Sequence, residues 1–212
     1  MNDQIKVGIL GGERRYMPAT ITRAIDGGDD NVGAVIEGVA ALIDVETDLG
    51  WMRETIAPGA FDEVLSSPDL DCRCLFNHDS NMVLARKSAK VSTLELFKNA
   101  DGHLAFRYTT PNRQFAKDLA DSIAAGDVSQ CSFQFRVKEQ RWVFAENPND
   151  QDLRIVEKVG ELMDVGPVTF AAYPDTSVAK RSMEKEKKIF QPESSKRMKL
   201  LNARYMFNSN KK

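Results

Sequence analysis

The strongest structural signal in this sequence is an alternation of apolar and polar residues over positions 131–144, CSFQFRVKEQRWVF. Cys131, Phe133 and Phe135 fall on one side of the segment, and Ser132 falls on the other. Successive side chains of a β-strand point to opposite faces, so this period of two predicts a strand with one buried face. A chain that contains such a strand needs partner strands and a core to cover that face.

Further strands are predicted by short apolar or alternating runs bounded by turn residues. They cover residues 33–45, 71–77, 81–87, 91–98, 103–108, 153–163 and 165–172, the last two being separated near Gly166 and Pro167. Apolar spacing predicts one clear helix at 112–125, with Asn112 as its cap and Gly126 at its end, and a short one after Pro58. The fold class expected is mainly β with packed helices, arranged as a closed or nearly closed antiparallel β-barrel.

Length and composition favour a globular protein. The chain has 212 residues, of which 42% are hydrophobic, enough for one domain with appendages. We expect a soluble protein from a reducing compartment, because no apolar run is long enough for a membrane span and three cysteines do not form a disulfide framework. No secretory signal is expected at the N-terminus.

Charge is distributed unevenly along the chain. Residues 180–212 carry 11 Lys and Arg but 3 Asp and Glu, which leaves 18 basic and 28 acidic side chains in residues 1–179. We therefore predict three parts: a lead-in segment at 1–32, a domain at 33–181 and a basic tail at 182–212. The tail is either a solvated extension or an interaction arm. It has too few interleaved aromatic residues to indicate a nucleic-acid platform.

Histidines are scarce, which narrows the search for catalytic groups. Of the two in the chain, His103 follows a hairpin turn and is expected at the surface, whereas His78 lies between a strand end and a polar turn. Ser132 is a candidate nucleophile if His78 acts as its base, although it also fits a solvated strand face. A third group must orient the base: Asp164, inside an apolar strand, is preferred to Asp79.

Other chemistries remain open at this point. Glu161 is the reserve candidate for the acidic group. Cys131 is an alternative nucleophile, although the alternation places it in the core. Cys72 and Cys74 with His78 lack a fourth ligand and the spacing of a zinc site, so neither a metal nor another cofactor is expected.

Five segments, taken in their order and spacing, resemble the prohead (capsid-maturation) proteases of tailed bacteriophages. The resemblance covers residues 33–181, and its segments are 37–65, 75–86 (LFNHDSNMVLAR), 92–106, 122–135 (SIAAGDVSQCSFQF) and 161–181 (ELMDVGPVTFAAYPDTSVAKR). Two positions depart from the family pattern: Gly166, where members usually have Ser, and Ala171, where they often have Pro.

The resemblance implies a function and a site. In that family the His of the NHD segment and the Ser of the SF-x-F segment are catalytic, which corresponds to His78 and Ser132, and an acidic residue corresponding to Asp164 completes the triad. The implied fold is similar to that of the herpesvirus assembly proteases, a β-barrel surrounded by helices. The implied activity is a serine endopeptidase that processes the major capsid protein, scaffold segments and itself during prohead maturation.

The same resemblance implies where the protein acts and with what. Its location would be the host cytoplasm, inside the immature capsid, and the related viral proteases suggest a homodimer. Neither nucleic acid nor a membrane is expected as a partner. Two rival functions are a non-catalytic assembly or scaffolding module on the same barrel and a small-molecule binding barrel lined by the aromatic strand 133–144.

Overall fold

The fold is known from a computed structural model. It describes residues 13–25, 33–147, 149–170 and 183–184, with the backbone alone for residues 16–25. The chain divides into two compact units, Met1–Asp175 and Thr176–Lys212. The sequence also suggests a strand at 5–10 and a helix at 198–207. Both lie outside the described residues, as does nearly all of the basic tail, and the three-part domain division stays a prediction.

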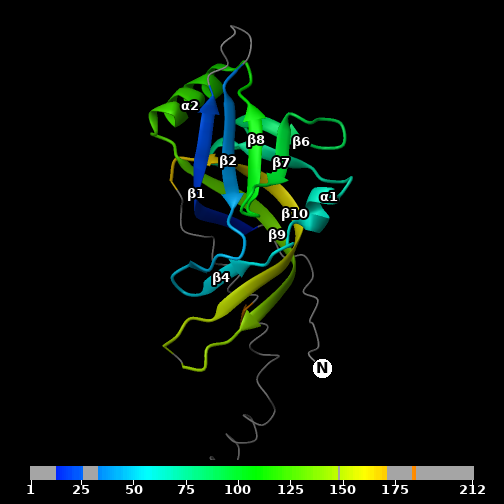
Figure 1. Cartoon of the computed structure of the whole chain (residues 1–212), viewed down its shortest axis with the longest axis vertical. Coiled ribbons are helices and arrows are strands. Elements are labelled where there is room, and N and C mark those ends of the chain that lie inside the picture. Colours follow the sequence, from blue (N-terminus) through cyan, green and yellow to red (C-terminus); the bar gives the residue numbers. More distant parts are fainter. Residues whose placement is uncertain (1–12, 26–32, 148, 171–182, 185–212) are drawn as a thin grey trace, which may run out of the picture. The chain divides into compact units, whose positions relative to one another are not determined.

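Within the first unit the structure is mainly β, which confirms the predicted class (Figure 1). Two helices, α1 (Asp62–Ser66) and α2 (Gln114–Ala125), and one 3₁₀ turn, η1 (Phe76–His78), interrupt the strands. The strands are β1 (Glu13–Ile25), β2 (Val35–Ala41), β3 (Thr47–Asp48), β4 (Arg53–Ile56), β5 (Cys72–Leu75), β6 (Val83–Lys87), β7 (Leu94–Lys98), β8 (Leu104–Thr109), β9 (Gln130–Val143) and β10 (Leu153–Val168).

The strands pair in the order β3-β4-β10-β9-β1-β2-β8-β7, with β5 added to β10 and β6 added to β5. Pairing of the named strands does not close this sheet among the described residues. Between β6 and β7 there is one isolated bridge, from Lys87 to Ser92. The closed barrel therefore remains unconfirmed.

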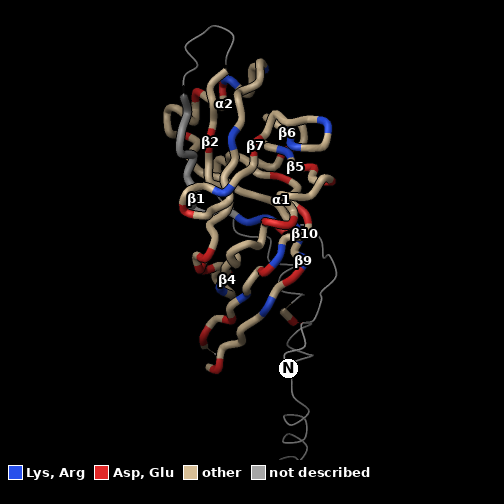
Figure 2. The backbone as a smooth tube through the Cα atoms, turned by 45° about the vertical axis from the view of Figure 1, so that its right-hand side comes forward, with Lys and Arg blue, Asp and Glu red and all other residues tan. Residues whose placement is uncertain are grey.

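The longest pair, β9 with β10, is built on the alternation seen in the sequence. Phe133 and Phe135 of β9 are completely buried and stack with ring centroids 4.9 Å apart. The outer half of the pair carries both charge signs, as Figure 2 shows, and cross-strand ion pairs such as Lys158–Glu139 at 3.0 Å join the strands there. One face thus anchors the hairpin in the core while charged pairs hold the exposed part.

Strand β1 was not foreseen. The sequence predicted a poorly anchored lead-in before residue 33, yet Glu13–Ile25 pairs antiparallel with β9 through its first half and with β2 through its second half. This strand has no clean alternation of apolar and polar residues, because its buried positions include the charged side chains of Glu13 and Arg15. The period-two signal fails where ion pairs replace apolar burial.

Helix α2 forms close to where it was predicted. Its buried stripe (Ala116, Leu119, Ala120 and Ile123) has the expected helical spacing. Gly126 ends the helix with a φ of 86° and donates its N–H to Ile123, as the left-handed C-cap motif requires. The predicted cap is wrong, because the N-cap is Arg113 rather than Asn112 and no side chain caps the helix.

The C-terminal strand also differs from expectation. The break predicted near Gly166 and Pro167 is wrong, since β10 runs without interruption from Leu153 to Val168. Pro167 pairs with Cys131 of β9 on one side, and β5 pairs with β10 only at Asp164 and Val165 on the other. Beyond the end of β5, no described strand pairs with that edge of β10. Position 167 therefore needs no N–H donor there, and a proline is tolerated.

Candidate active site

Three elements distant in the sequence bring the predicted site residues together. His78 ends η1, Ser132 lies on β9 and Asp164 lies on β10. The antiparallel register sets Ser132 opposite Gly166, two residues beyond Asp164. The parallel pairing of β5 with β10 carries the chain from Cys74 into η1 beside Asp164.

Ser132 is oriented by the rigid strand around it. Its neighbours Cys131 and Phe133 are completely buried in the core, so the alternation directs Ser132 to the opposite face. That face is not solvated here, because Ser132 is itself 0% exposed. Its Oγ lies 3.0 Å from the main-chain oxygen of Arg15 in β1, an acceptor that competes with His78 Nε2 for the single hydroxyl proton.

The imidazole of His78 lies between the other two groups. Its Nε2 is 2.6 Å from Ser132 Oγ, and its Nδ1 contacts Asp164 Oδ2. A carboxylate accepts a hydrogen bond from Nδ1–H, which leaves the lone pair of Nε2 to accept from the serine hydroxyl. The arrangement can therefore move a proton from Ser132 to His78, the first step of nucleophilic catalysis by a hydroxyl.

The carboxyl group of Asp164 is held in the protein interior. Its side chain is 3% exposed, and the main-chain N–H of Leu75 donates to its Oδ1 at 3.2 Å. Burial raises the pKa of Asp164 above its ordinary value, while the hydrogen bonds from His78 and Leu75 act in the opposite direction. Both oxygens of Asp164 thus have a fixed partner, which orients the carboxyl group toward the imidazole.

Gly166, one of the two departures from the family pattern, has a structural role at this site. A Cβ at this position would lie 2.2 Å from the carbonyl oxygen of Leu75, well inside van der Waals contact. The absence of a side chain therefore lets the end of β5 approach β10 closely. The same close approach brings the N–H of Leu75 to Asp164.

The alternative acidic groups have other partners. Glu161 pairs with Arg136 on the exposed face of the β9–β10 pair, and its side chain is 46% exposed. Asp79 accepts hydrogen bonds from the N–H and the side-chain amide of Asn81, within its own turn. Among the described acidic residues, Asp164 is the one that contacts His78.

The three thiols are buried, and burial raises their pKa values. Cys131 is 0% exposed, and burial raises its pKa to about 12, so the thiol stays protonated near neutral pH. Burial, with the nearby Asp164, also raises the pKa of Cys72 and Cys74. No group of three or more potential metal ligands was found in the part of the chain that the structure describes.

His103 lies outside this site and is only partly exposed. Its Nδ1 accepts a hydrogen bond of 3.1 Å from the main-chain N–H of Ile43. This contact ties the β7–β8 hairpin to the segment that follows β2, so His103 is a structural residue rather than a purely solvated one.

A buried ion-pair cluster near the site was missed from the sequence. Arg15 and Arg154 alternate with Glu13 and Glu54, and all four side chains are at most 1% exposed. Burial alone would raise the pKa of Glu13, but Arg154 and Arg15 hold it below its ordinary value. The cluster joins β1, β4 and β10, and Arg15 is also the residue whose carbonyl contacts Ser132.

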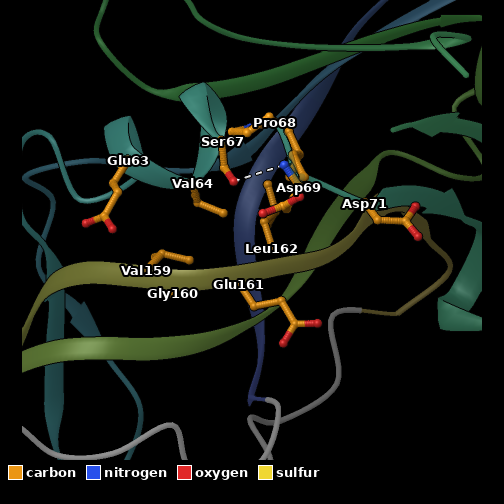
Figure 3. A pocket seen from close by; sticks show the side chains of 11 residues that line it. Glu63, Val64, Ser67, Pro68, Asp69, Asp71, Val159, Gly160, Glu161 and Leu162 are labelled. Carbon is orange, nitrogen blue, oxygen red and sulfur yellow. Dashed lines mark hydrogen bonds between the residues drawn. The ribbon is translucent and has the colours of Figure 1, made fainter. Parts of the chain in front are cut away.

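A cavity lies elsewhere, between the loop that follows α1 and strand β10. Figure 3 shows Val64 and Leu162 lining it together with acidic side chains such as Glu63 and Asp69; its volume is about 460 Å³. None of the three site residues lines it.

No helix among the described residues has the length and apolar character needed to cross a membrane.

Comparison with known proteins gives a family and a structural neighbour. The sequence profile of the family described as Caudovirus prohead serine protease matches residues 19–189. No curated protein matches the sequence. The capsid assembly protease of bacteriophage T4 is a solved structure with 14% identity and a TM-score of 0.45; the alignment covers 74% of this chain and 96% of that one.

Proposed function

Since the chain belongs to the Caudovirus prohead serine protease family, we propose that it is a serine endopeptidase with Ser132 as nucleophile, His78 as base and Asp164 as orienting acid. Membership makes it a protease of capsid maturation. The observation that supports the residue assignment is the position of the His78 ring, 2.6 Å from Ser132 Oγ on one side and bound to Asp164 on the other.

The proposed reaction follows from this geometry. His78 Nε2 takes the hydroxyl proton as Ser132 Oγ attacks the carbonyl carbon of a substrate peptide bond. The imidazolium then gives that proton to the leaving amine, and an ester to Ser132 remains. His78 next removes a proton from a water molecule that attacks the ester, and returns it to Ser132 Oγ as the carboxylic acid product leaves and loses its own proton to solvent. Asp164 keeps Nδ1–H directed toward itself and stabilises the imidazolium.

The proposed substrates are the scaffold or scaffold-like segment of the major capsid protein, and the chain itself, inside the immature shell. We propose association as the switch. Confining many copies in a small volume favours weak dimers by mass action, so activity would rise with local concentration. The basic tail would be an assembly arm or a self-cleaved peptide. Cleavage at full rate by a dilute monomer would contradict this switch.

The test of catalysis is co-expression of the chain with its capsid protein, followed by intact-mass analysis of both. Ser132→Ala and His78→Ala should each abolish cleavage, which corresponds to a loss of about 10⁶-fold in rate for a triad nucleophile or base. Ser122→Ala and His103→Gln are matched controls, because the described side-chain hydrogen bonds of these residues, to the carbonyl of Asp118 and from the N–H of Ile43, lie outside the proposed triad. Cleavage by Ser132→Ala but not by Cys131→Ala would instead assign the nucleophile to Cys131.

A second candidate is a non-catalytic assembly module. It is favoured by the burial of Ser132, which is 0% exposed, and of the His78 side chain, which is 3% exposed, since a substrate must reach both groups. A serine-directed fluorophosphonate separates the two candidates. Labelling at Ser132 in the wild-type chain, lost in His78→Ala, supports the protease; a chain that is neither labelled nor active supports the module.

A further inference from the structure

The backbone around His78 has a rare conformation. Asn77 has φ 53° and ψ 26°, and His78 follows with φ 59°. Two successive residues other than glycine therefore occupy the left-handed region. L-amino acids other than glycine seldom adopt it, because Cβ then lies close to the following carbonyl oxygen. Interactions elsewhere must hold this pair in place.

The side chain of Asn77 supplies such interactions. Its Oδ1 accepts the main-chain N–H of Thr169 at 2.8 Å, and its Nδ2 donates to Thr169 Oγ1 at 3.1 Å. A main-chain N–H can only donate, so the amide oxygen must face it, and this sets the amide orientation. Thr169 directly follows β10, the strand that carries Asp164.

Two main-chain hydrogen bonds of the turn are local to it. The N–H of Asp79 donates to Phe76, and the N–H of Phe76 donates to Met82. These bonds shape the loop between β5 and β6 but do not join it to β10. The two Asn77 bonds connect the turn to the end of β10, across 92 positions in the sequence.

We propose that Asn77 is a positioning residue that acts through His78, a step that rests on the proposed protease function. By binding Thr169 it holds the left-handed turn, and with it the imidazole, in line between Ser132 and Asp164. It does not itself contact the reacting atoms. Proton transfer depends steeply on donor–acceptor geometry, so a turn released from β10 would place Nε2 poorly against Ser132 Oγ.

The decisive variant is Asn77→Gly. Glycine adopts the left-handed conformation without strain, so this change removes the two hydrogen bonds while leaving the backbone geometry accessible. We expect kcat to fall by about 10- to 100-fold with little change in KM. The NMR resonance of the proton between His78 Nδ1 and Asp164, which we expect far downfield in the wild type, should broaden or disappear in the variant. Thr169→Val, which keeps the main-chain donor but removes the hydroxyl, should have the same effects to a smaller degree.

Two further variants separate positioning from general damage. Asn77→Asp keeps an acceptor for Thr169 N–H, and the threonine hydroxyl can donate to its second oxygen, so the downfield resonance should be retained. Asn81→Ala is the matched control: it removes an amide of the same loop that bonds only to Asp79, and it should leave kcat and the resonance unchanged.

These experiments distinguish a failure of the Asn77 proposal from a failure of the proposed protease function. A folded Asn77→Gly variant with wild-type kcat and an unaltered resonance overturns the proposal. If the wild type cleaves nothing, the protease assignment fails, and the resonance alone still decides whether Asn77 positions His78. If Asn77→Gly does not fold, Thr169→Val decides, and a resonance unchanged there also overturns the proposal.

Discussion

At the scale of single residues, the site depends on a carboxyl group whose burial opposes its charge. Asp164 is enclosed by β5, η1 and β9, and its two oxygens receive hydrogen bonds from His78 and from the N–H of Leu75. Burial raises its pKa, so the folded protein retains a proton there to higher pH than the unfolded chain does. Asp164 thus orients His78, the proposed base, at some expense in the free energy of unfolding at pH values above the ordinary pKa of an aspartate.

Asp164→Asn should separate the effect of Asp164 on activity from its effect on the free energy of unfolding. Activity should fall by about 10⁴-fold, the loss seen when a triad carboxylate is replaced. The contribution of Asp164 to stability is present below its unfolded pKa, near 3.8, and is lost as pH rises through its raised folded pKa. The free energy of unfolding of the variant, measured by urea titration, should therefore increase relative to the wild type as pH rises through that window.

Asp71→Asn is the control for the pH trend. The hydrogen bond from Arg86 lowers the pKa of Asp71, so its contribution is present above the unfolded pKa and is lost as pH falls. This variant should become less stable relative to the wild type as pH rises, the opposite sign to Asp164→Asn. Identical trends in both variants would contradict the assignment of a raised pKa to Asp164.

At the scale of elements, the site depends on how closely β5 approaches β10. Gly166→Ala would place a Cβ 2.2 Å from the carbonyl oxygen of Leu75, which belongs to the backbone and cannot rotate away. We expect a loss of about 1–3 kcal/mol in the free energy of unfolding, as for other overpacked sites. Cleavage should slow by about 100-fold, because Asp164 and His78 move with the displaced strand.

Gly160→Ala on the same strand is the matched control. Its Cβ would lie 3.1 Å from the Cβ of Lys138, so the neighbour must shift by only a few tenths of an ångström, far less than the backbone clash at Gly166 requires. Thermal unfolding and the cleavage rate of this variant should stay near those of the wild type. If Gly166→Ala behaves like Gly160→Ala, close strand approach is not what orients Asp164.

At the scale of the whole molecule, the buried ion-pair cluster of Glu13, Arg15, Glu54 and Arg154 links strands from both ends of the described chain. Glu54→Gln would leave two buried guanidinium groups with one carboxylate. Removing one member of a buried ion pair destabilises a protein by about 3–5 kcal/mol, because a charge remains without compensation. Thermal unfolding should show a midpoint lower by on the order of 10 °C.

Glu46→Gln provides the comparison for this change. Glu46 pairs with Arg53 at 2.7 Å, but both side chains are more than 40% exposed. Such surface pairs contribute about 0–1 kcal/mol, so the melting temperature should move little. Equal shifts for Glu54→Gln and Glu46→Gln would show that the buried cluster does not anchor β1.

Local patterns determined a large part of this molecule. The alternation over β9 predicted the strand, its buried aromatic face and the opposite direction of Ser132, because a period of two depends only on neighbouring residues. The spacing in α2 and the glycine at its end were equally local signals. The sequence also indicates His78, Ser132 and Asp164, since the chain offers few groups for each role and the family resemblance assigns a role to each of them.

Only the tertiary structure decided the remainder. The insertion of β1 between β9 and β2, the buried cluster of four charges and the continuity of β10 through Pro167 depend on pairings between distant segments. The hydrogen bonds between Asn77 and Thr169, and the close approach of Gly166 to Leu75, also join residues about 90 positions apart. The spacing of apolar residues along the chain does not predict such contacts, because the partners of each group are distant in the sequence and meet only in the folded protein.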